Sequence, residues 1–159
     1  MPVDLWSFTL DFYARPGVEQ ACLQLQAQGA DVCVVLCGVW LGWRAVPCTD
    51  VRVVALDQPA GPWQVQVVGP LRALRTQWRQ AATGDSALAT LREQVKALEL
   101  QAERTLLERL QALAGDWPQG QVQDVQGWLD ALAGQQDAPH GRCCATRPVR
   151  STLRKRCLA

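Results

Sequence analysis

The sequence predicts an all-α protein made of about six helices, and three observations predict it. Apolar residues recur at spacings of three and four along most of the chain, and no stretch sustains the alternation of a strand. Residues 86–114 form one long periodic segment. Apolar residues make up 48% of the 159 residues, which suffices for a core and excludes a disordered or collagen-like chain. We expect one helical domain over residues 1–134 and a basic tail over residues 135–159.

The first third of the chain predicts three short helices. They run from Asp4 to about Arg15, from Val18 to Gln28 and from Val32 to about Ala45. Asp4 and Asp31 are the expected N-caps of the first and third helices, and Gly29 is the expected residue after the second. The third segment is apolar nearly all round, which predicts a central buried helix.

The next segment leaves its secondary structure open. Residues 50–56 are rich in valine and fit either a strand or a helix. Residues 59–62, Pro-Ala-Gly-Pro, are expected to form a loop. Residues 63–82 contain Pro70, so either residues 64–68 form a strand or one helix is kinked there. The kinked helix is favoured, because a five-residue strand has no partner nearby.

Residues 86–114 predict the longest helix, with Asp85 in the break before it. Its apolar residues follow a seven-residue repeat that shifts by four at Leu106: Leu88, Leu91, Val95, Leu98, Ala102, Leu106, Leu110 and Leu113. A helix of this length spans about 43 Å, whereas a compact domain of this size has a radius of gyration near 15 Å. It should therefore cross the whole body or project from it. Asp116 and Pro118 are expected to open a last helix through Leu132, closed by Gly134.

Basic residues gather in two places, although the formal net charge is only +1. Between residues 58 and 84 the charged residues are Arg72, Arg75 and Arg79, whose spacing places them on one helical face. They are the candidate site for an anion or a partner, with no catalytic residue assigned. Alternatively, this face is solvated and pairs with acids of a neighbour, such as Glu93 or Glu99. Residues 138–159 carry six basic residues and no acid, which fits either a nucleic-acid-binding arm or a disordered solubilising tail.

The sequence contains no combination of residues that is typical of a catalytic site. The single histidine, His140, lies in the tail, and no phosphate-binding glycine loop is present. Glu99 and Glu103 are expected on the solvated side of the long helix. The spacing of His140, Cys143, Cys144 and Cys157 matches no paired zinc motif, so neither a metal nor a cofactor is expected. Of the seven tryptophans, Trp63 and Trp117 are the candidates for exposed partner anchors.

The chain is expected to be cytoplasmic. Its N-terminus has no basic segment of a signal peptide, and seven cysteines, an odd number, favour reduced thiols. The longest apolar run, residues 32–43, has twelve residues, fewer than the roughly 18 of a membrane span.

A resemblance supports the helical prediction. The run Leu5-Trp6-Ser7-Phe8, the segment from Phe12 to Glu19 and the segment from Gly29 to Leu41 resemble a small family of proteobacterial proteins of unknown function, known best from pseudomonads and vibrios. Pro70-Leu71-Arg72 and Arg75 are similar to it as well. The resemblance covers roughly residues 4–115. It implies a helical fold and a gamma-proteobacterial cytoplasm, and it implies no activity.

Three hypotheses for function follow. The first is a non-catalytic interaction or regulatory module that binds another protein, or a second copy through the long helix. An exposed apolar patch within residues 88–113 would support it. The second is a nucleic-acid-associated protein that uses residues 138–159 and the arginine face. The third is an enzyme acting on a small anion in a pocket beside Arg72 and Arg75.

Overall fold

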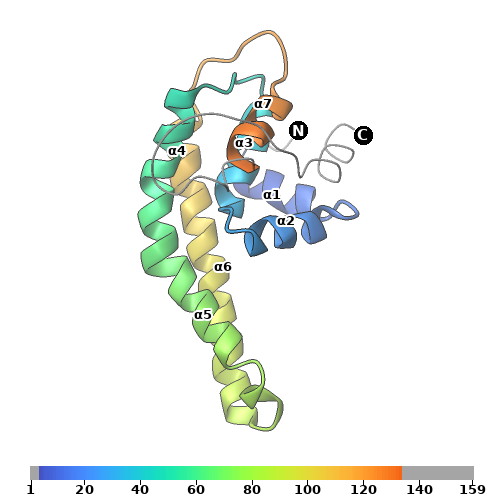
Figure 1. Cartoon of the computed structure of the whole chain (residues 1–159), viewed down its shortest axis with the longest axis vertical. Helices are drawn as coiled ribbons and strands as arrows, with labels where there is room; N and C mark the ends of the chain where they lie inside the picture. The colour runs from blue at the N-terminus through green and yellow to red at the C-terminus, as the bar shows by residue number, and fades with distance from the viewer. Residues whose placement is uncertain (1–3, 134–159) are drawn as a thin grey trace.

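A computed structural model of the chain describes residues 4–133, which form helices joined by turns and loops (Figure 1). The all-α prediction is confirmed for these residues, and the expected tail lies outside them. The α-helices are α1 (Leu5–Tyr13), α2 (Val18–Ala27), α3 (Val32–Trp43), α4 (Asp50–Trp63), α5 (Gly69–Gln77), α6 (Ser86–Ala114) and α7 (Val125–Ala133). Two short segments interrupt them: the π-helical turn η1 (Gln64–Val68) and the 3-10 turn η2 (Ala81–Thr83).

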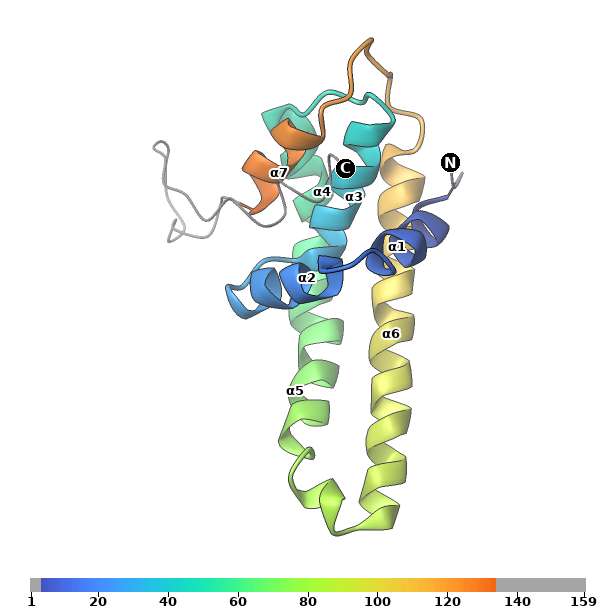
Figure 2. The same ribbon diagram turned by 90° about the vertical axis from the view of Figure 1, so that its right-hand side faces the viewer.

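The described residues divide into two regions. The body contains α1, α2, α3, α4, α7 and the C-terminal half of α6 (Figure 1). The projecting hairpin, residues 64–100, contains η1, α5, η2 and the N-terminal half of α6, and it extends well beyond the body (Figure 2). The prediction that the long helix would project from the body is therefore confirmed.

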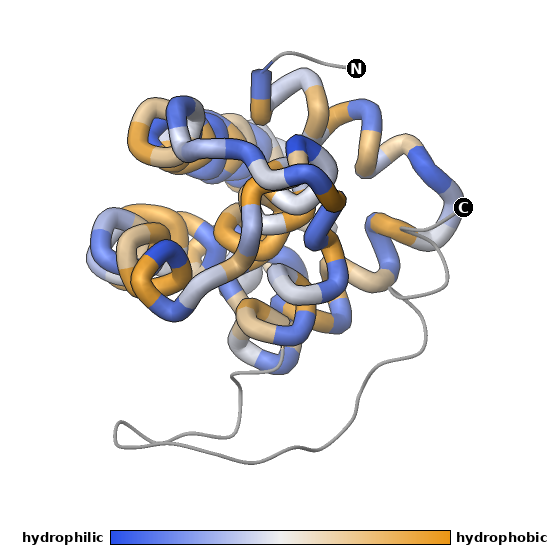
Figure 3. Tube along the Cα trace, turned by 90° about the horizontal axis from the view of Figure 1, so that it is seen from above, coloured by the Kyte–Doolittle hydropathy of each residue, from blue (hydrophilic) through white to orange (hydrophobic). Residues whose placement is uncertain are grey.

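The core is built around α3. Ten of its residues are buried, from Cys33 to Gly42, as its continuous apolar sequence predicts. Two glycines of α3 let α7 approach closely: a Cβ on Gly42 would lie 2.6 Å from the Cα of Val125, and one on Gly38 would lie 2.5 Å from a methyl group of Leu132. Hydrophobic and hydrophilic residues are mixed along most of the tube (Figure 3), which is typical of amphipathic helices packed around a core.

Most of the expected helix ends are confirmed. The carboxylate of Asp4 accepts a hydrogen bond from Ser7 N at 2.8 Å, and that of Asp31 accepts one from Cys33 N at 3.0 Å. Asp85 caps α6 by accepting from Leu88 N at 3.0 Å. Gly29 follows α2 with a φ of 92°, a conformation that glycine adopts without strain.

The loop expected at residues 59–62 is wrong, because α4 continues through Pro59 and Pro62. Ala60, between the two prolines, is 1% exposed, and Trp63 Nε1 donates to Ala102 O of α6 at 3.0 Å. These tertiary contacts hold the segment in a helix despite the missing proline N–H groups. Residues 50–56 are likewise helical.

The strand alternative for residues 64–68 is excluded, because an irregular helical turn takes its place, and the helix ends at Gln77 rather than near residue 82. The irregular turn is η1, which lies on the N-terminal side of Pro70. A π-helical turn takes one more residue than an α-helical turn, and it accommodates the hydrogen bond that Pro70 cannot donate.

The last helix begins later than expected. Asp116 and Pro118 lie in a loop, and α7 starts at Val125. Asp124 provides the start: its Oδ1 accepts from Gly127 N at 3.2 Å and its Oδ2 accepts from Cys48 N at 2.7 Å. The loop itself is tied to the end of α3, since Asp124 N donates to Gly42 O at 3.0 Å. The bond from Gly127 N is a local N-cap, whereas the bonds with Cys48 and Gly42 join distant residues and lie beyond local cap signals.

Candidate interaction surface

The candidate surface lies on the projecting hairpin, whose packing is sparse. Helix α5 has no buried residue, and α6 is its principal neighbour. In the N-terminal half of α6 the buried residues are Val95 and Glu99. Helix stability in proteins comes mainly from tertiary packing, so this region depends on a small number of contacts.

The side of α6 that faces α4 and α5 is rotated from the predicted apolar stripe. We call it the inner seam, and its buried or half-buried members are spaced by four or three residues: Leu88, Arg92, Val95, Glu99, Ala102, Leu106 and Leu110. Leu91 and Leu98, two members of the predicted seven-residue repeat, are 49% and 52% exposed. Arg92 and Glu99 take the inward positions instead.

The exposed leucines belong to a second row on α6, which we call the outer seam. Its spacing is alternately four and three, and its members are Ala87, Leu91, Gln94, Leu98, Gln101 and Thr105. All are exposed except the half-buried Thr105, and none is charged. An α-helix with two such seams can pack against two neighbours. Within residues 4–133, α4 and α5 pack along the inner seam, and Trp6 of α1 borders the outer seam beside Gln101 and Thr105.

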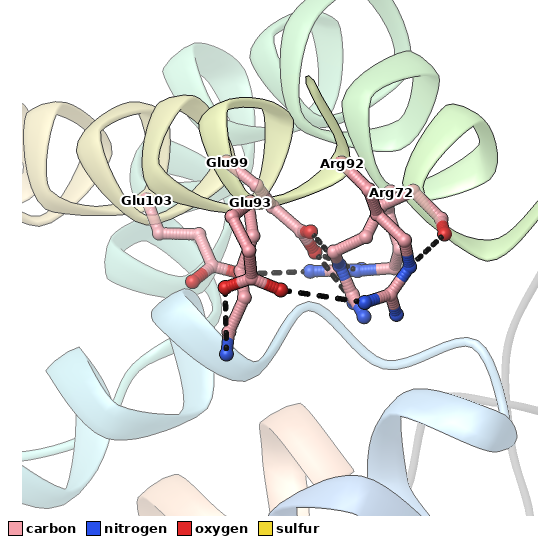
Figure 4. Close-up of polar contacts among 7 residues, drawn as sticks. Arg72, Arg92, Glu93, Glu99 and Glu103 are labelled. Atoms are coloured by element: carbon pink, nitrogen blue, oxygen red, sulfur yellow. Dashed lines mark hydrogen bonds and ion pairs between the residues drawn. The ribbon is translucent and has the colours of Figure 1, made fainter. Parts of the chain in front are cut away.

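The polar part of the inner seam is an ion-pair network between α5 and α6 (Figure 4). Glu99 is 6% exposed. Its carboxylate accepts from Arg72 Nε at 2.9 Å and from Arg75 Nη2 at 3.2 Å, with a further short contact from Arg75 Nε. Arg72 Nη2 also donates to Glu103 at 2.7 Å. Arg92 Nε donates to the carbonyl oxygen of Arg75 at 3.0 Å, which anchors the end of α5.

The network shifts the pKa values of its members in opposite directions. Burial acts to raise the pKa of Glu99, but the hydrogen bonds from Arg75 and Arg72 outweigh it, so that pKa lies below its ordinary value. Those same bonds raise the pKa of Arg75. Burial raises the pKa of Glu103 despite Arg72, and burial also raises the pKa of Asp31 at the start of α3.

The predicted arginine face is thus divided between two environments. Arg72 and Arg75 donate to acidic residues of α6. Their pairing with Glu99 is one that the alternative interpretation of the arginine face expected. Arg79 follows the end of α5 and is exposed. Glu99, which was expected on the solvated side of α6, is buried. The signal for this was available: the stretch 58–84 has three arginines and no acid, and Glu99 lies four residues after the inward-facing Val95.

The thiols among the described residues are held in their protonated form. Cys22, Cys33 and Cys37 are buried and free, and burial raises the pKa of each. Burial raises the pKa of Cys48 to about 11. A reactive thiol requires a lowered pKa. Residues 4–133 also contain no cluster of three or more His, Cys, Asp or Glu side chains placed to hold a metal ion; the His140, Cys143, Cys144 and Cys157 set lies outside them.

The two tryptophans considered as partner anchors are both half-buried and engaged. Trp63 is tied to α6, and the guanidinium of Arg109 lies 3.9 Å from its ring centre. Trp117 stacks on Trp128 with ring centres 6.4 Å apart. A different tryptophan borders an open depression of about 420 Å³: Trp6 of α1 faces Leu100 and Arg104 of α6 there. Gln101 and Thr105 line the same depression, so it adjoins the outer seam.

No helix within residues 4–133 is both long enough and apolar enough to cross a bilayer.

The comparisons assign the chain to a family without a described activity. Residues 4–110 match the family described as "Protein of unknown function (DUF2390)", and the chain belongs to that family. No curated protein and no solved structure matches the chain significantly.

Proposed function

We propose that the protein is a non-catalytic interaction module whose outer seam on α6 binds another polypeptide. The observation that carries this proposal is the exposure of Leu91 and Leu98, at 49% and 52%, on one uncharged helical face. Exposed apolar side chains are common singly, but a periodic row of them on a projecting helix is typical of a contact surface.

The arginine network favours this proposal over an enzyme acting on a small anion. Such an enzyme needs guanidinium groups that reach a substrate. Arg72 and Arg75 instead donate to Glu99 and Glu103. The role proposed for Arg79 is a contact at the tip of the hairpin, where it is exposed.

A cytoplasmic location in a proteobacterium fits this proposal. The buried free thiols of Cys22, Cys33 and Cys37 suit a reducing compartment. The resemblance described above supports the proteobacterial origin.

The proposal is tested by site-specific photo-crosslinking in the host cell. A benzophenone amino acid replaces Leu98 in one variant and Leu23 of α2 in a control, since both leucines are 52% exposed. We expect a light-dependent adduct with a polypeptide from position 98 and none from position 23. Failure to form an adduct from position 98, or equal yield from position 23, contradicts the proposal.

A second candidate, binding of nucleic acid, rests on the six basic residues and absent acids of residues 138–159. Its support is electrostatic, because contacts between basic side chains and phosphates release counterions and weaken with salt. We expect a salt-dependent affinity for duplex DNA or RNA whose slope decreases when residues 138–159 are deleted. Equal slopes for the full and shortened chains exclude this candidate.

A further inference from the structure

We infer that the junction between the body and the projecting hairpin is an acid-sensitive contact, where the carboxylates of Asp31, Glu99 and Glu103 take up one proton and so hold the hairpin more firmly. Asp31 precedes α3 in the body, whereas Glu99 and Glu103 lie on α6 where that helix enters the body. The junction is separate from the outer seam, so this contact does not depend on a partner bound there.

The charges at this junction do not balance. Arg72 and Arg75 of α5 both pair with Glu99, and Arg72 Nη2 also donates to Glu103 at 2.7 Å (Figure 4). With Asp31, three carboxylates meet two guanidinium groups, so one negative charge is in excess. An excess charge costs more in a partly buried place than in water, and its repulsion acts against the ion pairs that hold α5 to α6. Uptake of one proton removes that cost.

Asp31 has an oxygen that the fold leaves without a partner. Its Oδ1 caps α3 by accepting from Cys33 N at 3.0 Å. Its Oδ2 is buried, and within residues 4–133 it has no hydrogen-bond donor. A buried acceptor without a donor is costly, and more so when it carries charge. Asp31 is therefore poorly stabilised in its ionised form, although it is needed as a cap.

Asp31 and Glu103 interact with each other across the junction. Burial raises the pKa of each, and Arg72 acts to lower the pKa of each. The negative charge of Asp31 adds to the effect of burial on the pKa of Glu103, as does that of Glu99. Carboxylates that interact in this way gain and lose protons in steps that belong to the group rather than to one residue. The structure thus assigns the proton to the cluster.

The other titratable and charged groups near these carboxylates do not supply the missing positive charge. Burial raises the pKa of three groups, which stay neutral between pH 5 and 7: Tyr13 of α1, Cys22 of α2 and Cys33 of α3. Asp57 of α4 adds a further negative charge, which acts to raise the pKa of Asp31. On α6, Glu93 pairs with Arg92 and Lys96. Solvent screens these pairs, since the Glu93 and Lys96 side chains are 62% and 63% exposed.

The test is hydrogen exchange of the full chain at pH 7, 6 and 5. Each rate is divided into the intrinsic rate of the same amide at that pH, which gives a protection factor. The folded pKa values of Asp31 and Glu103 lie above their unfolded values, so the ionised forms destabilise the fold at high pH. This cost fades as pH falls through the folded pKa values. We therefore expect the protection factors of α5 to rise about twofold or more between pH 7 and pH 5.

Two variants remove the excess charge, and each should reduce this rise by at least half. Glu103→Gln keeps an oxygen that can accept from Arg72. Asp31→Asn keeps an oxygen that can cap α3, because asparagine is as good an N-cap as aspartate. Glu108→Gln is the matched control, since Glu108 also lies on α6 but pairs with Arg104 at 3.0 Å, outside the junction. The control should respond to acid like the wild type.

Three results overturn the inference. The α5 amides of the wild type are equally protected at pH 7 and pH 5, or a folded junction variant keeps the whole rise, or the Glu108→Gln control loses it. Circular dichroism checks that each variant is folded. Either junction variant suffices for the comparison when the other is unfolded, because each removes one of the three carboxylates.

Discussion

The body and the projecting hairpin are stabilised by different interactions. In the body, apolar side chains surround α3, and Leu41, Val39 and Cys37 are each 0% exposed. In the hairpin, α5 has no buried residue, and Arg72 and Arg75 are held to α6 through Glu99. Apolar contacts tolerate small rotations of a helix, whereas hydrogen-bonded ion pairs require particular faces to meet. The comparison suggests that the body supplies stability and that the ion pairs set the register of the hairpin.

The largest expected effect is in the body. Trp128 is 0% exposed, and its Nε1 donates to Val46 O at 2.8 Å. Trp128→Ala should lower the free energy of unfolding by about 3–5 kcal/mol, because it leaves a cavity and an unpaired carbonyl. Urea denaturation followed by circular dichroism measures this. A loss below about 1 kcal/mol would contradict the view that α7 completes the core.

The next effect is in the hairpin. Glu99→Gln removes the charge that pairs with Arg72 and Arg75, and we expect the free energy of unfolding to fall by about 2 kcal/mol. This is less than for a fully buried pair, because the arginine side chains are about 21–22% exposed. Hydrogen exchange should accelerate in α5 and leave α3 unchanged. Glu93→Gln is the matched control, since the Glu93 side chain is 62% exposed and should contribute about 0.5 kcal/mol or less. Faster exchange throughout the body would show that the two regions unfold together.

The pH dependence follows from the shifted pKa values. Because the folded pKa of Glu99 is lowered, its stabilisation is present above its unfolded pKa and is lost as pH falls through the folded pKa. Glu103 and Asp31 have raised pKa values, so their protonation relieves a cost as pH falls. The stability difference between wild type and Glu99→Gln should therefore shrink below about pH 4.5. Urea denaturation at pH 7, 5, 4 and 3 checks this, and a constant difference would refute it.

The smallest effect is expected at the outer seam. In the monomer, at about 1 µM protein, Leu98→Gln should change the free energy of unfolding by no more than about 0.5 kcal/mol. Leu23→Gln, at the same 52% exposure, should do the same. Thermal unfolding of both variants measures this, and a larger loss for Leu98→Gln would place that side chain within the monomer's packing.

Much of the fold is predictable from local signals. The limits of α6 at residues 86 and 114, the caps at Asp4 and Asp31, and the burial of α3 follow from capping chemistry and apolar periodicity. Those signals involve neighbouring residues on one helix. The sequence therefore contains them directly.

The rest depends on contacts between distant residues. The continuation of α4 through Pro59 requires the contact of Trp63 with Ala102, and the start of α7 requires the hydrogen bond of Asp124 with Cys48. Glu99 was expected on the solvated side of α6, and its burial likewise depends on distant residues, because Arg72 and Arg75 of α5 pair with it.

The π-helical turn at residues 64–68 has a consequence for insertions and deletions. Each residue of an α-helix advances the chain by about 100° around its axis and about 1.5 Å along it. Removing one residue from a regular part of α4 or α5 would turn Arg72 and Arg75 away from Glu99. Removing one residue within the turn would convert it to an ordinary α-helical turn, with both flanks left in place. The hairpin thus has a position where the chain can change length while its ion pairs keep their partners.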